Sequence, residues 1–228
     1  MADFSIAYPL TIANEGGYGI DNNGAEVYRG INRLFNPTWQ GWNVIDAIKK
    51  NYAYKNNWTD ARADAYVQPY VKQNYWQPIQ ADKILNQPFA NLLFDFFYES
   101  GANAVKELQK ELGFTGADVD GILGRNTLAA LNTQLQTNGE NLYNNFYNDR
   151  YNFTQALVPK IISQNDWASI EKRIENYANA FVDEILKTAD AAGNTVKSTV
   201  KKNPFTIILR ITFGVIILNE IFKTKQHG

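Results

Sequence analysis

Hydrophobic residues recur along most of this chain at spacings of three and four, separated by polar residues. This spacing predicts helices, because residues three or four apart share one face of an α-helix. The stretch 89–98 is hydrophobic all round and follows Pro88, a residue favoured in a first helical turn, so we expect the central buried helix there. No run up to residue 185 alternates with a period of two for long enough to form a large sheet. The sequence therefore predicts an all-α (α-dominated) body, with a small hairpin within 18–28.

Further helices are predicted on both sides of this central one. Residues 44–50 form a short amphipathic segment that ends in lysines. Thr59 and Asp60 are typical helix caps, and the helix that they start is expected to end before Pro69. Residues 139–187 read as further helices and carry an apolar stripe at helical spacing, which predicts packing against a neighbour: Ile170, Ile174, Tyr177, Phe181 and Ile185.

The composition changes after Thr188. Residues 188–203 are small, polar or basic, which predicts a linker, and residues 204–222 are mainly apolar. A membrane-spanning helix needs about 20 such residues, and Arg210 within the run costs about 2.5 to 3.5 kcal/mol on insertion scales. Lysines on both sides would anchor the run at head groups. We therefore expect a C-terminal hydrophobic helix that spans a membrane, with a buried or oligomerising helix as the alternative.

The charged and reactive residues restrict the chemistry. The 228 residues include 22 Lys plus Arg against 23 Asp plus Glu, so the chain has no global basic field to attract nucleic acid. There is no Cys, and the single His is His227 in the tail. Asp118 and Asp120 lack the remaining ligands of a calcium loop. Without thiolates or a histidine in the body, acid and base catalysis falls to carboxylates, and we expect no cofactor or metal.

Three carboxylates cluster around a glycine-rich stretch near the N-terminus. Glu15 closes an apolar run and precedes Gly16 and Gly17, each of which would cost about 1 kcal/mol inside a helix, so Glu15 should face a loop. Asp21 and Glu26 follow within the next eleven residues. Glycoside hydrolysis uses such a pair: one protonated acid, and one carboxylate across the cleft. From these residues alone, a Glu15 that merely ends a helix is the competing interpretation.

The same stretch resembles the N-terminal signature of the glycoside hydrolase family 108 muramidases. The similarity lies in Glu-Gly-Gly-Tyr at 15–18 after an apolar helix, an Asp at 21, and Gly-Ala-Glu-Val-Tyr-Arg-Gly-Ile at 24–31. It implies a lysozyme-like fold and the role of catalytic acid for Glu15. The sequence departs from the family pattern at Asn14, where His is frequent, and at Val27, where Thr is usual. A Thr hydroxyl at that place would position the attacking water.

Asp21 and Glu26 remain alternatives for the second carboxylate. Substrate contacts are expected from aromatic and polar side chains, because rings cover the apolar face of a sugar and polar groups bond its hydroxyls. A hydrophobic core with wet edges has the same composition, and Asp95 within the central helix is either a structural hydrogen-bond acceptor or functional. The predicted substrate-binding residues are Tyr18, Tyr28, Arg29, Tyr75, Trp76, Asp95 and Tyr98.

A second stretch, 101–131, resembles the peptidoglycan-binding module that accompanies the same muramidases. It carries Leu-Gln-x-x-Leu-Gly and then Asp-Gly-Ile-x-Gly-x-x-Thr-Leu-x-Ala-Leu. Together the resemblances cover about residues 1–185. They imply an N-terminal catalytic lobe at 1–86 and a helical peptidoglycan-binding lobe at 87–187.

The sequence as a whole predicts a peptidoglycan-degrading muramidase that hydrolyses the MurNAc-GlcNAc bond and is tethered to a membrane in the bacterial cell envelope. The first five residues show no secretory signal, so the route of export is open. One alternative is a catalytically impaired peptidoglycan-binding protein of a phage-like or secretion assembly, which Val27 and the hydrophobic tail favour. A purely structural membrane-anchored component is the other.

Overall fold

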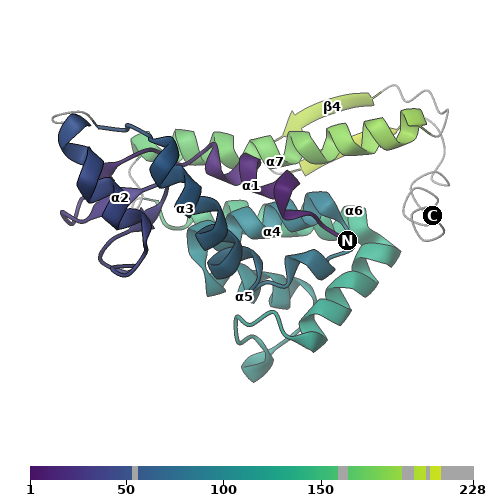
Figure 1. Ribbon diagram of the computed structural model, residues 1–228. Coiled ribbons are helices and arrows are strands. Elements are labelled where there is room, and N and C mark those ends of the chain that lie inside the picture. The colour runs from purple at the N-terminus through teal and green to yellow at the C-terminus, as the bar shows by residue number, and fades with distance from the viewer. Residues whose placement is uncertain (53–55, 159–163, 192–197, 204–205, 212–228) are drawn as a thin grey trace. The chain divides into compact units, whose positions relative to one another are not determined.

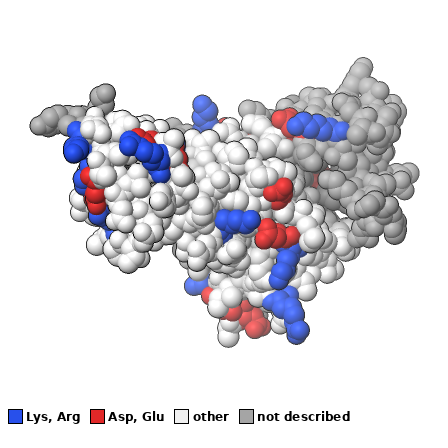
Figure 2. Space-filling model, viewed as in Figure 1, with Lys and Arg blue, Asp and Glu red and all other residues white. Residues whose placement is uncertain are grey.

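The computed structural model describes residues 1–52, 56–158, 164–191, 198–203 and 206–211. The chain divides into two compact units, an N-terminal unit (Asp3–Asp82) and a C-terminal unit (Met1–Ala2 with the chain from Lys83 onward). Helices dominate the described residues, as predicted (Figure 1). On the face shown in Figure 2, basic and acidic side chains are interspersed and most of the surface is uncharged.

The N-terminal unit begins with a helix and a small sheet. The side chain of Asp3 caps α1 (Phe4–Ile12) by accepting a hydrogen bond from the backbone of Ser5 at 2.7 Å. The chain then forms an antiparallel three-stranded sheet in the order β1-β2-β3. Its strands are β1 (Gly19–Ile20), β2 (Glu26–Tyr28) and β3 (Ile31–Asn32). The small hairpin that the sequence predicts at this place is therefore present, with a third short strand added.

Short helices complete the N-terminal unit. The predicted cap Asp60 accepts a hydrogen bond from the backbone of Arg62, but the helix that it starts does not end before Pro69, which lies inside it. A π-helical turn follows directly, so the prediction was wrong at this end. The elements are α2 (Gly41–Ile48), η1 (Lys49–Tyr52), α3 (Ala61–Val71), η2 (Lys72–Trp76) and η3 (Ala81–Lys83).

Aromatic side chains form much of the core of the N-terminal unit. Trp58 packs between two tyrosine rings, with centroid distances of 4.9 Å to Tyr18 and 4.4 Å to Tyr52. Trp39 and Trp42 are both buried, and their rings meet edge to face at 5.1 Å. These two tryptophans are therefore core residues of the fold.

The C-terminal unit is a set of helices around α4 (Gln87–Ser100). The side chain of Asn86 caps this helix and Pro88 lies in its first turn, and the run from Phe89 to Phe96 is buried. The predicted central helix is thus confirmed. The other helices of the unit are α5 (Ala102–Glu111), η4 (Gly116–Asp118), α6 (Arg125–Gln155, with a kink at Asn138) and α7 (Gln164–Ala191).

A buried ionic cluster ties three helices of the C-terminal unit together. The fully buried Asp95 of α4 accepts from Arg150 of α6 at 2.5 Å and from Arg173 of α7 at 2.7 Å. Glu99, one turn further along α4, forms ion pairs with the same two arginines. Burial disfavours the charge of Asp95, but the two arginines outweigh it and hold its pKa below the ordinary value.

The C-terminal part differs from the prediction. The linker expected from residue 188 begins later, because α7 continues to Ala191, and 198–203 is strand β4 (Ser198–Asn203). Strand β5 (Thr206–Ile211) pairs antiparallel with it, so these six residues of the predicted membrane helix are extended. The rest of 204–222 and of the linker lies outside the described residues. Among the helices that the structure describes, none has the length and apolarity that crossing a membrane requires.

Candidate functional site

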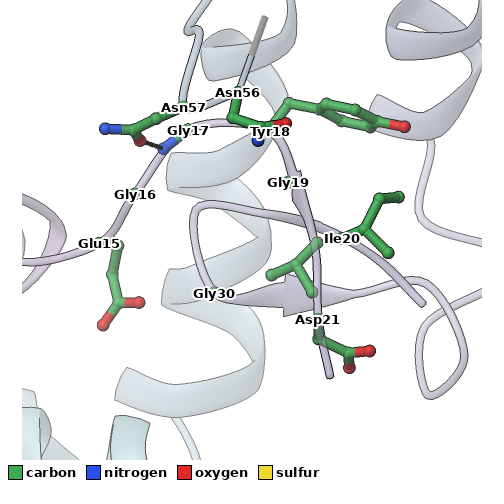
Figure 3. Close-up of a pocket in the computed structure, with 11 residues that line it drawn as sticks. Glu15, Gly16, Gly17, Tyr18, Gly19, Ile20, Asp21, Gly30, Asn56 and Asn57 are labelled. Atoms are coloured by element: carbon green, nitrogen blue, oxygen red, sulfur yellow. Dashed lines mark hydrogen bonds between the residues drawn. The ribbon is translucent and has the colours of Figure 1, made fainter. Parts of the chain in front are cut away.

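The glycine-rich loop after α1 borders a cavity of about 480 Å³ within the N-terminal unit. Both Glu15 and Asp21 line the cavity, together with residues of strands β1 and β2 (Figure 3). In this view the two carboxylates point to the same side of the loop. The remaining lining residues are Gly16, Gly17, Tyr18, Gly19, Ile20, Val27, Gly30, Asn56 and Asn57.

The segment 56–58 holds the loop from one side. The Asn57 side chain accepts a hydrogen bond from the backbone of Gly17 at 2.5 Å, and the backbone of Tyr18 exchanges two bonds of 2.8 Å with Asn57 and Trp58. A Cβ atom at Gly17 would lie 2.1 Å from the carbonyl oxygen of Trp58. Only glycine allows this close approach, which explains the second glycine of the Glu-Gly-Gly motif.

Arg29 holds the loop from the other side. Its guanidinium donates to the carbonyl oxygen of Glu15 at 3.2 Å, and its backbone donates to that of Gly16 at 3.1 Å. Both carboxylate oxygens of Asp64 in α3 accept hydrogen bonds from the same guanidinium, at 3.1 and 3.3 Å. Arg29 was predicted to contact substrate, but these bonds engage it in fixing the backbone beside Glu15.

Glu15 itself is half-buried at the point where α1 gives way to the loop, as the two glycines predict. The pKa of the Tyr75 hydroxyl is raised first by burial and then by the negative charge of Glu15. Glu15 and Tyr75, two predicted site residues that lie sixty positions apart in the sequence, are thus within electrostatic range of each other. Tyr75 is half-buried on η2.

Asp21 is held as an ionised carboxylate in the turn between β1 and β2. One oxygen accepts from the backbone of Ala25 at 2.8 Å and of Asn23 at 2.9 Å, and the other accepts from the Asn32 side chain at 2.7 Å. These hydrogen bonds, chiefly that from Ala25, lower the pKa of Asp21. A carboxylate that faces a cavity and stays charged suits the second role in glycoside hydrolysis.

Glu26 is engaged in an ionic cluster and is not among the residues that line the cavity. One of its oxygens accepts from Tyr18 at 2.5 Å and from Lys49 at 2.8 Å, and the other accepts from Arg33 at 2.6 Å. Burial opposes the charge of Glu26, but these three donors outweigh it and lower its pKa. The pKa of Tyr18 rises to about 12, through burial and then through Glu26. Of the two candidates for the second carboxylate, the geometry favours Asp21.

Several other predicted substrate contacts are core residues in this fold. Trp76 is fully buried and its indole donates to Asp82 at 2.6 Å, while Tyr28 is fully buried and donates to Asp64 at 2.8 Å. Asp95 is enclosed by its arginines. None of these three side chains has an exposed surface for a sugar, so we correct their predicted role to a structural one. Tyr98, on α4 of the C-terminal unit, is half-buried against Phe94 with ring centroids 6.3 Å apart.

Sequence reasoning missed the residues that hold and complete the cavity. Asn56 and Asn57 line it from a segment about forty residues away, and no spacing relates them to Glu15. Asn57 has a φ of 57°. Asn tolerates this left-handed conformation better than most residues, so the residue type is the one local signal for the turn. Asp64 gives no signal, because it reads as an ordinary polar position of a helix. In the described part of the chain, no group of three or more His, Cys, Asp or Glu is placed to hold a metal ion.

Comparisons with known proteins support the family resemblance. Residues 8–101 match the family model described as Glycosyl hydrolase 108, so the resemblance drawn from the Glu-Gly-Gly-Tyr loop is confirmed for this part of the chain. The solved structure titled "Structure of Brucella abortus SagA" is 25% identical, with a TM-score of 0.57. The match covers 78% of this chain and 94% of that one. No curated protein matches.

Proposed function

We propose, from the premise that residues 8–101 carry the glycosyl hydrolase 108 pattern, that this protein is a muramidase that hydrolyses the MurNAc-GlcNAc bond of peptidoglycan. The observation that carries the proposal is that Glu15 and Asp21 line one cavity in different environments. Glu15 is half-buried, whereas three donors keep Asp21 charged. Environments that separate an acid from a carboxylate are what glycosidases require.

In this mechanism Glu15 is the general acid. Its proton passes to the glycosidic oxygen as the bond breaks, so that the leaving sugar departs as a neutral hydroxyl group. Asp21 remains ionised and either activates a water molecule or stabilises the positive charge that develops on the sugar ring. The anomer of the first product, read by NMR, separates inversion from retention.

The anchored loop supplies preorganisation. The backbone of Glu15, Gly16, Gly17 and Tyr18 is bonded on one side to Arg29 and on the other to the segment 57–58. A proton donor held in place before substrate arrives does not lose conformational freedom in the transition state, which favours catalysis. Asp64 takes part as a positioning residue, because it holds Arg29.

Replacing Glu15 by Gln tests the proposal, since the amide has nearly the same shape but cannot donate the proton. We expect Glu15→Gln to lower the rate of peptidoglycan hydrolysis at least about 1,000-fold and to leave the melting temperature within about 2 °C. Released reducing ends measure the rate, and circular dichroism measures the melting. Glu140→Gln, at a half-buried glutamate of α6, is the matched control and should keep full activity. Retained hydrolysis in Glu15→Gln would remove Glu15 as the acid.

A second candidate function is a wall-binding protein with impaired catalysis. Val27 favours it, because this residue lines the same cavity as both carboxylates and offers no hydroxyl to hold a water molecule. A wild-type protein that sediments with insoluble peptidoglycan but releases no reducing ends would support this candidate. Val27→Thr would then be expected to raise hydrolysis.

The site of action follows from the substrate. We place the protein in the bacterial cell envelope, because peptidoglycan is found there. Fractionation of cells that produce the full chain tests this location. A phage-like or secretion assembly stays a predicted partner, and a pull-down from cells that produce the tagged chain would test it.

A further inference from the structure

Two large hydrophobic side chains project into solvent from the turn after β3. Leu34 is 67% exposed and Phe35 is 77% exposed. We call these two residues the 34–35 tip. Each would gain roughly 1.5 to 3 kcal/mol if it were fully buried, so nothing in the stability of the isolated fold accounts for their exposure.

The tip is held rigidly by its neighbours on both sides. The Asn32 side chain accepts from the backbone of Leu34 at 2.8 Å, and the backbone oxygen of Asn32 accepts from both nitrogens of Asn36 at 3.0 Å. Arg33 forms ion pairs with Glu26 at 2.6 Å and with Asp46 at 2.7 Å. Side chains that are exposed on such a braced turn are presented in a fixed direction, which suits a binding surface.

The same asparagine connects the tip to the cavity. Its amide nitrogen donates to Asp21 at 2.7 Å while its oxygen accepts from Leu34. The tip therefore begins two residues from a direct contact of the proposed second carboxylate. Ile20, which lines the cavity next to Asp21, is itself 56% exposed. An apolar surface thus accompanies the Asp21 end of the cavity.

We infer that the 34–35 tip is a binding subsite for a sugar ring of the glycan chain, outside the cavity on the Asp21 side. The inference rests on the proposed function, because a polymeric substrate has to continue beyond the cavity that holds the cleaved bond. The ring of Phe35 would cover the apolar C–H face of a pyranose, with Leu34 widening the contact. The side chains of Asn36 and Arg33, on either side of the tip in the sequence, are bonded within the protein, so the contact with the sugar is mainly apolar.

The charges around the tip favour a glycan over a lipid surface. Elements that lie on membranes combine a broad apolar face with several Lys or Arg that meet anionic head groups. Beside the tip, Arg33 is already neutralised by Glu26 and Asp46, and Lys49 is bound to the same two carboxylates at 2.8 and 3.0 Å. The cations that a membrane would use here are thus held by partners.

The test measures glycan binding by calorimetry in the Glu15→Gln background, which prevents cleavage during the titration. The probes are soluble peptidoglycan glycans of two and of six sugars. We expect Phe35→Ala to weaken binding of the six-sugar glycan about tenfold and of the two-sugar glycan less than twofold, because only the longer chain reaches the tip. Phe35→Trp should retain binding of both. Tyr66→Ala, at an exposed aromatic of α3 that does not line the cavity, is the control.

Three results would overturn the inference. If Phe35→Ala binds six sugars as well as its parent does, the tip is no subsite, although hydrolysis by the wild type would leave the proposed function standing. If the parent binds no glycan and the wild type hydrolyses none, the proposed function and the inference fail together. If Phe35→Ala instead abolishes cosedimentation with phosphatidylglycerol vesicles and leaves glycan binding unchanged, the tip serves a membrane.

Discussion

The two units of this protein treat their carboxylates in opposite ways. In the C-terminal unit, Asp95 is fully buried and both of its oxygens are taken by Arg150 and Arg173. In the N-terminal unit, Glu15 and Asp21 line a cavity. A buried carboxylate that is paired on every side holds helices together, whereas carboxylates at a cavity can meet a substrate. Whether a carboxylate has a structural or a chemical role thus depends on its environment and not on the residue type.

The largest effect that we expect on stability comes from Asp95. Asp95→Asn leaves Arg150 buried without its main counter-charge, which costs about 3 to 5 kcal/mol in the free energy of unfolding. Urea denaturation followed by circular dichroism measures this loss. Glu99→Gln is the control at the exposed edge of the cluster and should cost less than half as much. Normal stability combined with lost hydrolysis would return Asp95 to the list of substrate contacts.

A smaller effect, on activity alone, is expected from Asp21. Asp21→Asn keeps the shape of the side chain but removes the negative charge, so we expect hydrolysis to fall about 100-fold, equivalent to about 2.7 kcal/mol in the activation barrier. The melting temperature should fall by no more than a few degrees. The kcat and KM of glycan hydrolysis should show the loss in kcat. Unchanged kcat would make Asp21 a turn residue only.

Glu26 should behave in the reverse manner. Glu26→Gln weakens the ion pairs with Arg33 and Lys49. We expect the free energy of unfolding to fall by only about 1 to 2 kcal/mol, because both partners are partly exposed to solvent, which screens the charges. The pKa of Glu26 is lowered by folding, so its stabilisation is present near neutral pH and disappears as pH falls through the folded value. Hydrolysis per folded molecule should stay within threefold of the wild type. A 100-fold loss would instead exchange the roles of Glu26 and Asp21.

The smallest effect concerns Asp149 of α6. Burial, and then the nearby charges of Glu111 and Glu107, raise its pKa from 3.8 to about 6. The folded protein thus binds this proton more tightly than the unfolded chain, so stability falls as pH rises from about 4 to about 6 and stays at the lower value above that. We expect Asp149→Asn to add about 1 kcal/mol at pH 7, after discounting for solvent screening, and nothing near pH 4. Thermal melts at the two pH values measure the difference, with Asp118→Asn as an exposed control.

The sequence predicted the elements that depend on local signals. The start of α4, the Asp60 cap and the loop after Glu15 follow from capping residues, proline and glycine, which act over a few positions. The end of α3 was missed: Pro69, a residue that usually ends a helix, lies inside α3, and the π-helical turn η2 follows directly. The apolar run after residue 204 has the composition of a helix, but 206–211 pairs with β4 in the structure. Composition does not determine pairing.

The candidate site was predictable only in part for the same reason. Glu15 and Asp21 stand out because carboxylates beside glycines are a short-range pattern. Whether Asp21 or Glu26 faces the cavity depends on Lys49 and Arg33, whose approach to Glu26 is a tertiary contact. The roles of Trp76 and Tyr28 depend on burial in the same way. An aromatic side chain can either pack in a core or bind a sugar, and its residue type does not distinguish the two.

The hydrogen bonds of the Glu15 loop also bear on how the site moves. The amides of Gly17 and Tyr18 both donate to the segment 57–58, and Arg29 links the carbonyl oxygen of Glu15 to α3 through Asp64. Local opening that exposes these amides to exchange with solvent deuterium therefore has to separate two chain segments at once. We therefore expect the Glu15 loop to open together with α3, and to exchange at rates set by that helix and not by those typical of glycine-rich loops.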